Sequence, residues 1–270
     1  MAFGCSRCEP PDGNEKPIDI AFQPIFDART GQVRAYEALV RGPNGEGAAS
    51  VLSQVADHEC HRFDQRVRML AIEKAAALGL ATTNAALSIN INSKAVIEAK
   101  RCLGNTIAAA ARAGLPHDRI VLEFSENARL DVKHARNIVR VYKKHGFRTA
   151  LDDFGNGYAG LATLADVPMD VIKLDMSLVR GIDASFARQA IVASVVGMMA
   201  KLDRNLVAEG VQTQSELATL QVLGVEMVQG FYLGRPSLTE LQREPIAWLT
   251  PGSVSPALPI PSRRRAAAPS

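Results

Sequence analysis

The sequence predicts an α/β protein that folds as a modified TIM-like (β/α)8 barrel with one antiparallel strand near the N-terminus. Three observations lead to this prediction: eight short β-rich runs, segments with helical spacing between most of them, and a first connection too short for a helix. The chain has 270 residues, of which 47% are hydrophobic and 22% charged, so it can bury one large core. Two smaller domains would also fit this length, and an open doubly wound sheet is the competing architecture.

The eight predicted strands are short runs of β-rich composition. In chain order they are Ile18–Phe26, Val33–Val40, Ala86–Asn92, Arg119–Ser125, Arg148–Asp153, Asp170–Asp175, Asn205–Gly210 and Met227–Leu233. Only the segment DARTGQ, residues 27–32, joins the first two strands. Because a parallel crossover needs about a dozen residues or more, these two strands should run antiparallel to each other.

Helical spacing appears in the longer segments between strands. The predicted helices are His61–Leu80, Ala95–Ala113, Asp131–His145, Tyr158–Asp166, Phe186–Leu202 and Gln214–Leu223. Thr213 and Glu216 have the spacing of a capping box at the start of the last helix. Glycines that should end helices stand at Gly79, Gly114, Gly146 and Gly224.

The two ends of the chain differ in composition from the part between them. We expect residues 1–17 to form a flexible leader, residues 18–250 to form the predicted barrel, and residues 251–270 to form a disordered Pro/Ser/Ala/Arg tail. Cys5 and Cys8 make a CxxC in the leader. We interpret them as two free thiols, with a metal knuckle or a redox sensor as the alternatives.

Charge and hydropathy exclude several classes of protein. The N-terminus lacks the pattern of a secretory signal, and the longest apolar run, residues 190–200, is shorter than the roughly 20 residues that span a membrane. A net charge of +3 does not indicate a nucleic-acid binder, and it is compatible with a small anionic ligand. We therefore expect a cytoplasmic protein that binds neither a membrane nor a nucleic-acid polymer.

Polar side chains stand at the ends of most predicted strands. In a barrel of this kind these ends converge on one face, where active sites lie. The residues are Glu37, Asn90, Glu123, Asp152, Asp153, Lys173, Asp175, Glu209 and Gln229. Any single acid could instead cap a following helix or pair with a surface lysine. Acids on so many different strands, however, would gather negative charge that requires a compensating cation.

The chemistry of these ligands favours a hard divalent cation. Oxygen ligands without His or Cys select Mg²⁺ or Mn²⁺ over zinc. Two ions that share one carboxylate would use the whole set and would suit phosphodiester hydrolysis. Arg41 and Lys173 would then supply positive charge for a phosphate, which carboxylates alone would repel. A barrel glycosidase that uses two carboxylates is an alternative from another class.

The order and spacing of eight motifs resemble those of EAL domains, the cyclic di-GMP phosphodiesterase family. The motifs lie between Ala21 and Pro236 and read QPIFD, YEALVRG, SININ, LEFSE, LDDFGNGY, VIKLDM, AEGVQT and VQGFYLGRP. The loop RGPNGEGAASVL and the segment HRFDQ are most similar to the EAL subgroup found in some blue-light-regulated proteins. Neither a photoreceptor nor a GGDEF domain accompanies these motifs, so we expect a stand-alone EAL domain.

The resemblance implies cyclic di-GMP as substrate, two Mg²⁺ or Mn²⁺ ions as cofactors, Ca²⁺ as an inhibitory ion, and a homodimer. The implied metal ligands are Glu37, Asn90, Glu123, Asp152, Asp153 and Glu209, with Asp152 shared between both ions. The implied catalytic residues are Glu37, Asp153, Lys173 and Glu209. The implied substrate contacts are Gln23, Arg41, Gln229 and Pro236, and Glu126 is implied to anchor the loop at residues 154–160.

Departures from the family pattern leave two functions to distinguish. Gln212 replaces a usual glutamate, Asn92 replaces a serine, and Asn156, Ala159 and Gly160 change the loop after the two aspartates. None of these substitutions removes an implied metal ligand. We therefore expect hydrolysis of one phosphodiester of cyclic di-GMP to linear pGpG. A degenerate domain that binds cyclic di-GMP or a partner protein without hydrolysis is the alternative.

Overall fold

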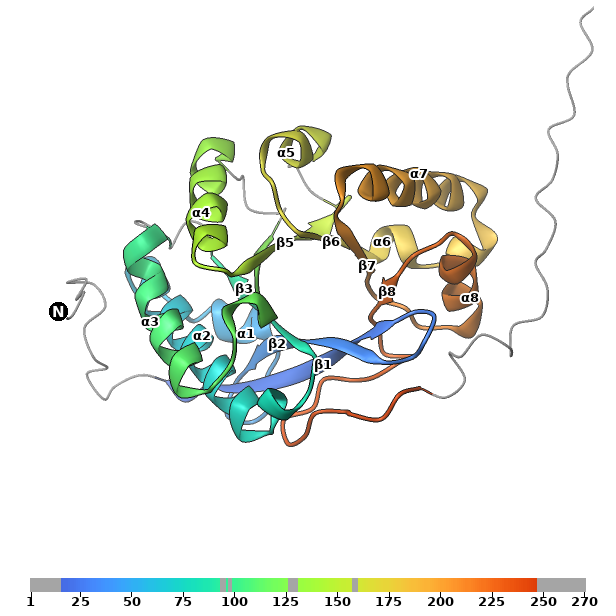
Figure 1. Ribbon diagram of the computed structural model, residues 1–270. Helices are drawn as coiled ribbons and strands as arrows, with labels where there is room; N and C mark the ends of the chain where they lie inside the picture. Colours follow the sequence, from blue (N-terminus) through green and yellow to red (C-terminus); the bar gives the residue numbers. More distant parts are fainter. Residues whose placement is uncertain (1–15, 93–95, 97–98, 126–130, 157–159, 247–270) are drawn as a thin grey trace, which may run out of the picture.

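The computed structural model describes residues 16–92, 96, 99–125, 131–156 and 160–246. Within these ranges the strands close into a barrel in sequence order, and the helices pack around its outside (Figure 1). The strands are β1 (Asp19–Asp27), β2 (Val33–Arg41), β3 (Ala86–Ile91), β4 (Ile120–Ser125), β5 (Arg148–Phe154), β6 (Val171–Leu174), β7 (Asn205–Ala208) and β8 (Met227–Val228). The predicted fold class is therefore confirmed.

The first strand is the antiparallel member of the barrel. β1 pairs antiparallel with β2, where Gln23 lies opposite Glu37, and it also pairs antiparallel with β8. The other neighbouring strands pair in parallel. Asp27 closes the hairpin, because its Oδ1 accepts hydrogen bonds from the N–H groups of Arg29 and Thr30 at 3.0 and 2.9 Å. The short first connection thus produces the antiparallel pair that its length predicts.

The helices begin and end close to the predicted signals. They are α1 (Ala48–Leu52), α2 (Cys60–Ala77), α3 (Ala99–Arg112), α4 (Val132–Lys144), α5 (Gly160–Asp166), α6 (Met176–Val179), α7 (Phe186–Leu202) and α8 (Gln214–Val222). The Oγ1 of Thr213 accepts a hydrogen bond from the N–H of Glu216 at 3.2 Å, which confirms the capping box. The predicted stop glycines adopt φ between 63° and 84° after helix ends, at Gly79, Gly114, Gly146 and Gly224.

Several boundaries differ from the prediction. β8 ends at Val228 instead of Leu233, because the carbonyl of Gly230 accepts the N–H of Leu233 at 3.0 Å and turns the chain away from the barrel. Ala95, the predicted start of the second helix, lies outside the described residues, and the structure describes this helix from Ala99 onward. Tyr158, the predicted start of the helix that ends at Asp166, lies outside the described residues. Helices α1 and α6 were not predicted, since five and four residues are too few to display a helical period.

The interior of the barrel is arranged in two layers. An apolar layer of mostly small side chains consists of Ile25, Ala35, Ala86, Val121, Ala150, Val171, Val207 and Met227. Side chains alternate along a strand, so the positions two residues away on each strand face the same interior. These positions form a polar layer of Gln23, Glu37, Ser88, Glu123, Asp152, Lys173, Glu209 and Gln229. Each strand, or the residue that directly follows β7 or β8, therefore contributes one polar side chain beside one apolar side chain.

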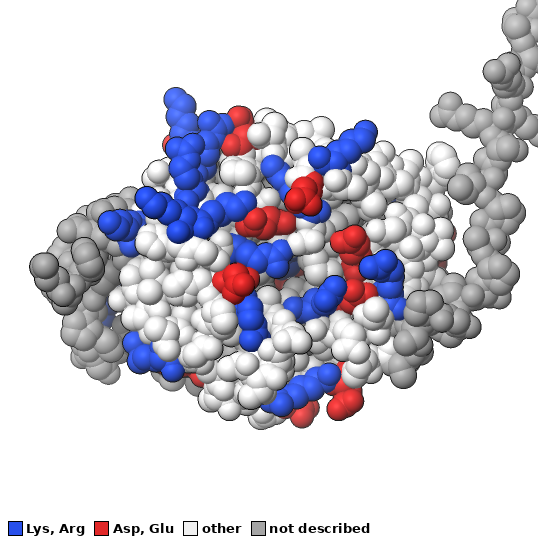
Figure 2. All heavy atoms as spheres, in the orientation of Figure 1, with Lys and Arg blue, Asp and Glu red and all other residues white. Residues whose placement is uncertain are grey.

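The outer surface carries charged side chains of both signs (Figure 2). On the face shown in Figure 2, lysine and arginine side chains are interleaved with aspartate and glutamate side chains. No helix in the described ranges has both the length and the apolar character needed to cross a membrane. The polar layer of the barrel holds buried charge, since Glu37, Glu123, Asp152 and Lys173 are all less than 9% exposed.

Candidate active site

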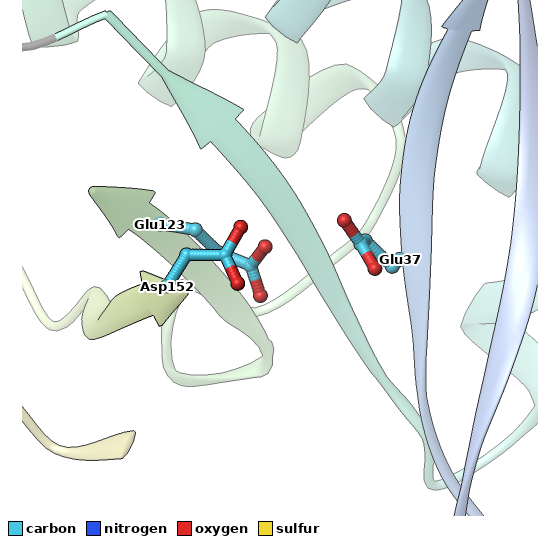
Figure 3. Close-up of side chains that lie close together, drawn as sticks. All are labelled: Glu37, Glu123 and Asp152. Atoms are coloured by element: carbon cyan, nitrogen blue, oxygen red, sulfur yellow. The ribbon is translucent and has the colours of Figure 1, made fainter. Parts of the chain in front are cut away.

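Carboxylates from β2, β4 and β5 converge in the polar layer. Glu37, Glu123 and Asp152 each offer an oxygen atom, and these atoms lie within 4.8 Å of one another. Figure 3 shows Glu123 and Asp152 together, with Glu37 facing them from β2. A second group with the same spacing consists of Asp152, Asp153 and Glu209. The site therefore offers two adjacent oxygen-rich positions that share the carboxylate of Asp152.

Lys173 places one ammonium group in the middle of this acidic cluster. Its Nζ lies 2.7 Å from Glu209 Oε1 and 3.0 Å from Glu123 Oε2. It also lies 3.1 Å from Asp152 Oδ1 and 3.3 Å from Glu37 Oε2, and the lysine side chain is 1% exposed. A single positive charge cannot balance four carboxylates, so the cluster would carry excess negative charge if all four were ionised.

The ionisation of Glu37 is supported by its neighbours. Burial raises the pKa of this carboxyl, but Lys173 and hydrogen bonds from Gln229 and Asn90 outweigh burial and lower the pKa overall. Burial lowers the pKa of the Lys173 ammonium, yet Asp152 and the three glutamates around it raise that pKa well above its usual range. Glu37 and Lys173 are therefore charged in the metal-free protein at neutral pH.

The other three carboxyls of the cluster resist ionisation. Burial raises the pKa of Glu123 to about 8, helped by repulsion from Glu37 and Asp152 and opposed by Lys173. Burial also raises the pKa of Asp152, and it raises the pKa of Glu209 well above its usual range, again against the attraction of Lys173. The metal-free cluster consequently holds protons at neutral pH, which a bound cation would displace.

Amide side chains surround Glu37 and fix both of its oxygens. Asn90 Nδ2 donates to Glu37 Oε1 at 3.1 Å, and Gln229 Nε2 donates to Glu37 Oε2 at 2.7 Å. Gln229 Nε2 also lies 3.2 Å from the Oε1 of Gln23, whose own amide donates to the carbonyl of Gly234 at 3.0 Å. Three residues predicted from the sequence, Gln23, Asn90 and Gln229, are thus brought together at Glu37.

The end of β5 is bent so that two adjacent aspartates serve the same site. Asp153 adopts φ of 59°, and the pairing of β5 with β6 shifts register between Leu151 and Phe154. The N–H of Asp153 donates to Asp152 Oδ1 at 3.0 Å, and the Oγ of Ser125 donates to Asp153 Oδ2 at 3.3 Å. In a regular strand consecutive side chains point to opposite faces. The irregular backbone therefore allows both carboxylates to reach the rim.

Two serines in the site were missed by the sequence analysis. The Oγ of Ser88 donates to Glu123 Oε1, and the Oγ of Ser125 contacts Asp153 as described above. Ser88 precedes Asn90 by two positions on β3, so the period of a strand already places both on one face. That signal was sufficient to find Ser88, whereas the contact of Ser125 depends on the bend of β5.

Three predicted residues that the structure describes, Arg41, Pro236 and Asp175, are not part of the acidic cluster. Arg41 Nη1 donates to the carbonyl of Val40 at 2.9 Å, and in the described part of the chain this arginine makes no hydrogen bond or ion pair with the cluster. Pro236 is half-buried beside the segment that pairs with β1. Glu126 lies outside the described residues. Asp175, which ends a predicted strand, instead caps α6 through the N–H of Ser177 at 2.8 Å.

The donor set fits hard divalent cations. Both acidic groups present carboxylate oxygens only, which suits Mg²⁺, Mn²⁺ or Ca²⁺ and disfavours a soft metal. Five carboxylates around one ammonium leave a net charge of about −4 when all are ionised, which two divalent cations would neutralise. Burial is the main cause of the raised pKa values of Glu123, Asp152 and Glu209, and repulsion from the neighbouring carboxylates adds to it.

Two curated proteins are similar to this chain over most of its length. The chain is 30% identical over 254 residues to the blue light- and temperature-regulated antirepressor BluF of Escherichia coli, covering 88% of this chain and 61% of BluF. It is 29% identical over 233 residues to the cyclic di-GMP phosphodiesterase NbdA of Pseudomonas aeruginosa, covering 81% of this chain and 31% of NbdA. The chain thus spans less than two thirds of the length of these relatives.

Solved structures share both the fold and much of the sequence. A standalone versatile EAL protein from Vibrio cholerae O395, in a form with c-di-GMP bound, has 43% identity and a TM-score of 0.80, covering 84% of this chain and 94% of that chain. BlrP1 of Klebsiella pneumoniae, in a complex with manganese and cyclic di-GMP, has 32% identity and a TM-score of 0.79, covering 86% and 59%. Residues 14–236 match the EAL domain as a family, and the chain therefore belongs to the EAL domain family.

Proposed function

We propose that this protein is a metal-dependent phosphodiesterase that hydrolyses one phosphodiester of cyclic di-GMP and releases linear pGpG. The observation that carries the proposal is the pair of acidic groups that share Asp152. The name of NbdA and the bound nucleotide in the Vibrio and Klebsiella structures support the same substrate for this chain. BluF and NbdA are considerably longer than the part of each that matches this chain, so their activities come to this chain only as a proposal.

The proposed ions would be Mg²⁺ or Mn²⁺, held by two sets of ligands. Glu37, Asn90, Glu123 and Asp152 would hold one ion, and Asp152, Asp153 and Glu209 would hold the other. When bound, such ions supply Lewis acidity for phosphate oxygens and lower the pKa of water. Ca²⁺, which suits the same oxygen ligands at longer bond lengths, is proposed to occupy the site without supporting turnover.

The chain's own residues would bind and orient the nucleotide. Gln23, Arg41, Gln229 and Pro236 are the proposed substrate contacts, and Arg41 would have to turn from the Val40 carbonyl toward a phosphate to serve in this way. Lys173 keeps its proton because of the acids around it, so it can present a fixed positive charge to the transition state. Glu126 is proposed to anchor the loop that follows Asp153.

The decisive experiment is hydrolysis of cyclic di-GMP by the purified chain with Mg²⁺ or Mn²⁺, followed by chromatography of the product. We expect pGpG, no product in excess EDTA, and no product from Glu37→Ala. Glu244→Ala is the matched control, since Glu244 is an exposed acid outside the cluster and should retain activity. Product formation that continues in excess EDTA would overturn the metal-dependent mechanism and would favour a metal-free hydrolase.

A catalytically degenerate receptor is the second candidate. It is favoured by the similarity to BluF, which is named as an antirepressor, and by the altered residues Asn156, Ala159 and Gly160 in the loop after Asp153. Isothermal titration with cyclic di-GMP in Ca²⁺ and the hydrolysis assay in Mg²⁺ separate the two functions. Tight binding without any pGpG would favour the receptor, whereas turnover that depends on Glu37 supports the enzyme.

A further inference from the structure

A buried ion pair on α2 lies beside the barrel, outside the acidic cluster. Arg68 Nη2 and Asp64 Oδ2 are 2.8 Å apart, one helical turn from each other, and their side chains are 0% and 6% exposed. Arg68 Nη1 donates to the Oγ1 of Thr106 on α3 at 3.1 Å. The pair therefore ties α2 to α3 in a place from which water is excluded.

The second oxygen of Asp64 reaches the end of a barrel strand. Asp64 Oδ1 accepts a hydrogen bond from the backbone N–H of Asn92 at 2.8 Å, and Asn92 directly follows the last residue of β3. Arg68, which is itself bonded to Thr106, holds one oxygen of the carboxylate, and the other oxygen is directed toward β3. The helix thereby fixes the strand end through a charge-assisted hydrogen bond.

This strand end carries Asn90, the amide that contacts Glu37. Pairing between β2 and β3 stops at Ala38 and Ile89, so Asn90 lies beyond the register with β2. Its side chain nevertheless bonds Glu37, which is on β2, at 3.1 Å. Asn90 has no β2 residue paired with it. Its position therefore depends on its pairing with β4 and on the hydrogen bond that Asp64 accepts from the N–H of Asn92.

Stability alone does not require a charged pair at this place. Burying an arginine and an aspartate carries a large desolvation penalty, and replacing such a pair by apolar side chains of similar size is often neutral or stabilising. Arg68 Nε also has no hydrogen-bond partner within the described part of the chain. What apolar side chains cannot provide is an acceptor for the N–H of Asn92.

We propose that Asp64, oriented by Arg68, is a positioning residue that sets the end of β3 so that the Asn90 amide faces Glu37. The role toward a metal rests on the proposed function, because it treats Glu37 and Asn90 as ligands. The structural role does not rest on the proposed function, since it concerns only the hydrogen bond at Asn92 and the contact between Asn90 and Glu37.

Two double variants separate positioning from stability. Asp64→Asn with Arg68→Met removes both charges but keeps an acceptor oxygen for the N–H of Asn92. Asp64→Leu with Arg68→Met removes both charges and the acceptor. Neither variant leaves a buried charge without its partner, so both avoid the main cost of breaking an ion pair. Urea unfolding measures the stability of each variant, and Asp64→Ala with Arg68→Met replaces the Leu version if that version does not fold.

The variants should differ in local protection and in metal affinity. We expect hydrogen exchange of the Asn92 amide, followed by NMR, to accelerate at least about tenfold in the variant without the acceptor and to stay near wild type in the Asn variant. Mn²⁺ affinity, measured by titration calorimetry, should fall by about tenfold or more only where the acceptor is lost. Equal Mn²⁺ affinity and equal Asn92 exchange in the two variants would overturn the proposal.

Failure of the proposed function gives a different result. If the wild-type protein binds no Mn²⁺, the metal site is wrong, and the exchange of Asn92 together with the NMR signal of the Asn90 side-chain amide still tests the positioning role. A changed Asn90 signal in the variant without the acceptor supports that role. An Asn90 signal unchanged in both variants contradicts it, whatever the metal titration shows.

Discussion

Lys173 and Glu123 form an ion pair 3.0 Å apart inside the barrel, with each side chain 1% exposed. The same ammonium contacts three further carboxylates, so its removal leaves the metal-free cluster without that compensation. We expect Lys173→Met to lower the free energy of unfolding at pH 8 by about 3–5 kcal/mol, the loss typical of a broken buried ion pair. Mn²⁺ should restore more stability to this variant than to wild type, which urea unfolding with and without Mn²⁺ measures.

Removal of the Lys173 ammonium by a different substitution should affect turnover more than binding. A lysine beside the reacting phosphate acts mainly on the transition state, so Lys173→Ala should keep cyclic di-GMP affinity in Ca²⁺ while turnover falls by about 100-fold or more. Lys144→Met, on the exposed surface of α4, is the control and should change neither quantity. Unchanged turnover in Lys173→Ala would show that the lysine is only structural.

The two adjacent aspartates should respond differently to substitution. Asp152 belongs to both acidic groups, whereas Asp153 belongs to one. Asp152→Asn should therefore weaken binding of every Mn²⁺ ion, and Asp153→Asn should weaken one ion and leave the other near its wild-type affinity. Titration calorimetry reports both the number of ions and their affinities. Equal losses in the two variants would contradict a shared carboxylate.

The barrel and most of its polar layer could be predicted from sequence because both depend on short-range periods. Strand runs, glycine stops and the hairpin-length first connection are local signals, and they determine which residues stand at the strand ends. Glu37, Asn90, Glu123, Asp152 and Lys173 follow from these signals, since parallel strands end on the same face.

Other parts of the site depend on contacts that no local pattern encodes. The positive φ of Asp153 accompanies a register shift between β5 and β6, which depends on how two distant segments pair. Asp175 looks like the other strand-end acids in sequence, but its chain turns at once into α6 and the carboxylate caps that helix. Asp64 lies about thirty residues before Asn92, so their hydrogen bond depends on how α2 packs against β3.

Glu216 should make stability depend on pH on the acid side. Burial raises the pKa of this carboxyl, but the N–H groups of Gly181, Gln212 and Thr213, together with Arg180, lower it overall. A depressed folded pKa stabilises the protein above the unfolded value of about 4.3, and this contribution is lost as the pH falls through the folded pKa.

Substitution of Glu216 tests that linkage. Glu216→Gln should lower the free energy of unfolding at pH 7, because the carboxylate is lost. At pH 3 the free energies of unfolding of the variant and the wild type should be closer to each other than at pH 7. Urea unfolding at the two pH values measures both effects. Glu226→Gln is the control, since the side chain of Glu226 makes no hydrogen bond or ion pair in the described part of the chain. A stability difference that is the same at both pH values would contradict the linkage.

Gly210, which directly follows Glu209, should not tolerate a side chain. Its φ is 73°, and an added Cβ would overlap the Cβ of Met176 at the start of α6. Gly210→Ala combines left-handed strain of about 1–2 kcal/mol with this overlap. We therefore expect a less stable protein, and weaker Mn²⁺ binding because Glu209 is displaced from Lys173.

Gly197→Ala is the matched control, because Gly197 lies in α7 with open space around it. This substitution should raise the free energy of unfolding by up to about 1 kcal/mol. Thermal unfolding and Mn²⁺ titration of both variants measure these effects, and wild-type Mn²⁺ affinity in Gly210→Ala would show that Glu209 does not depend on this turn.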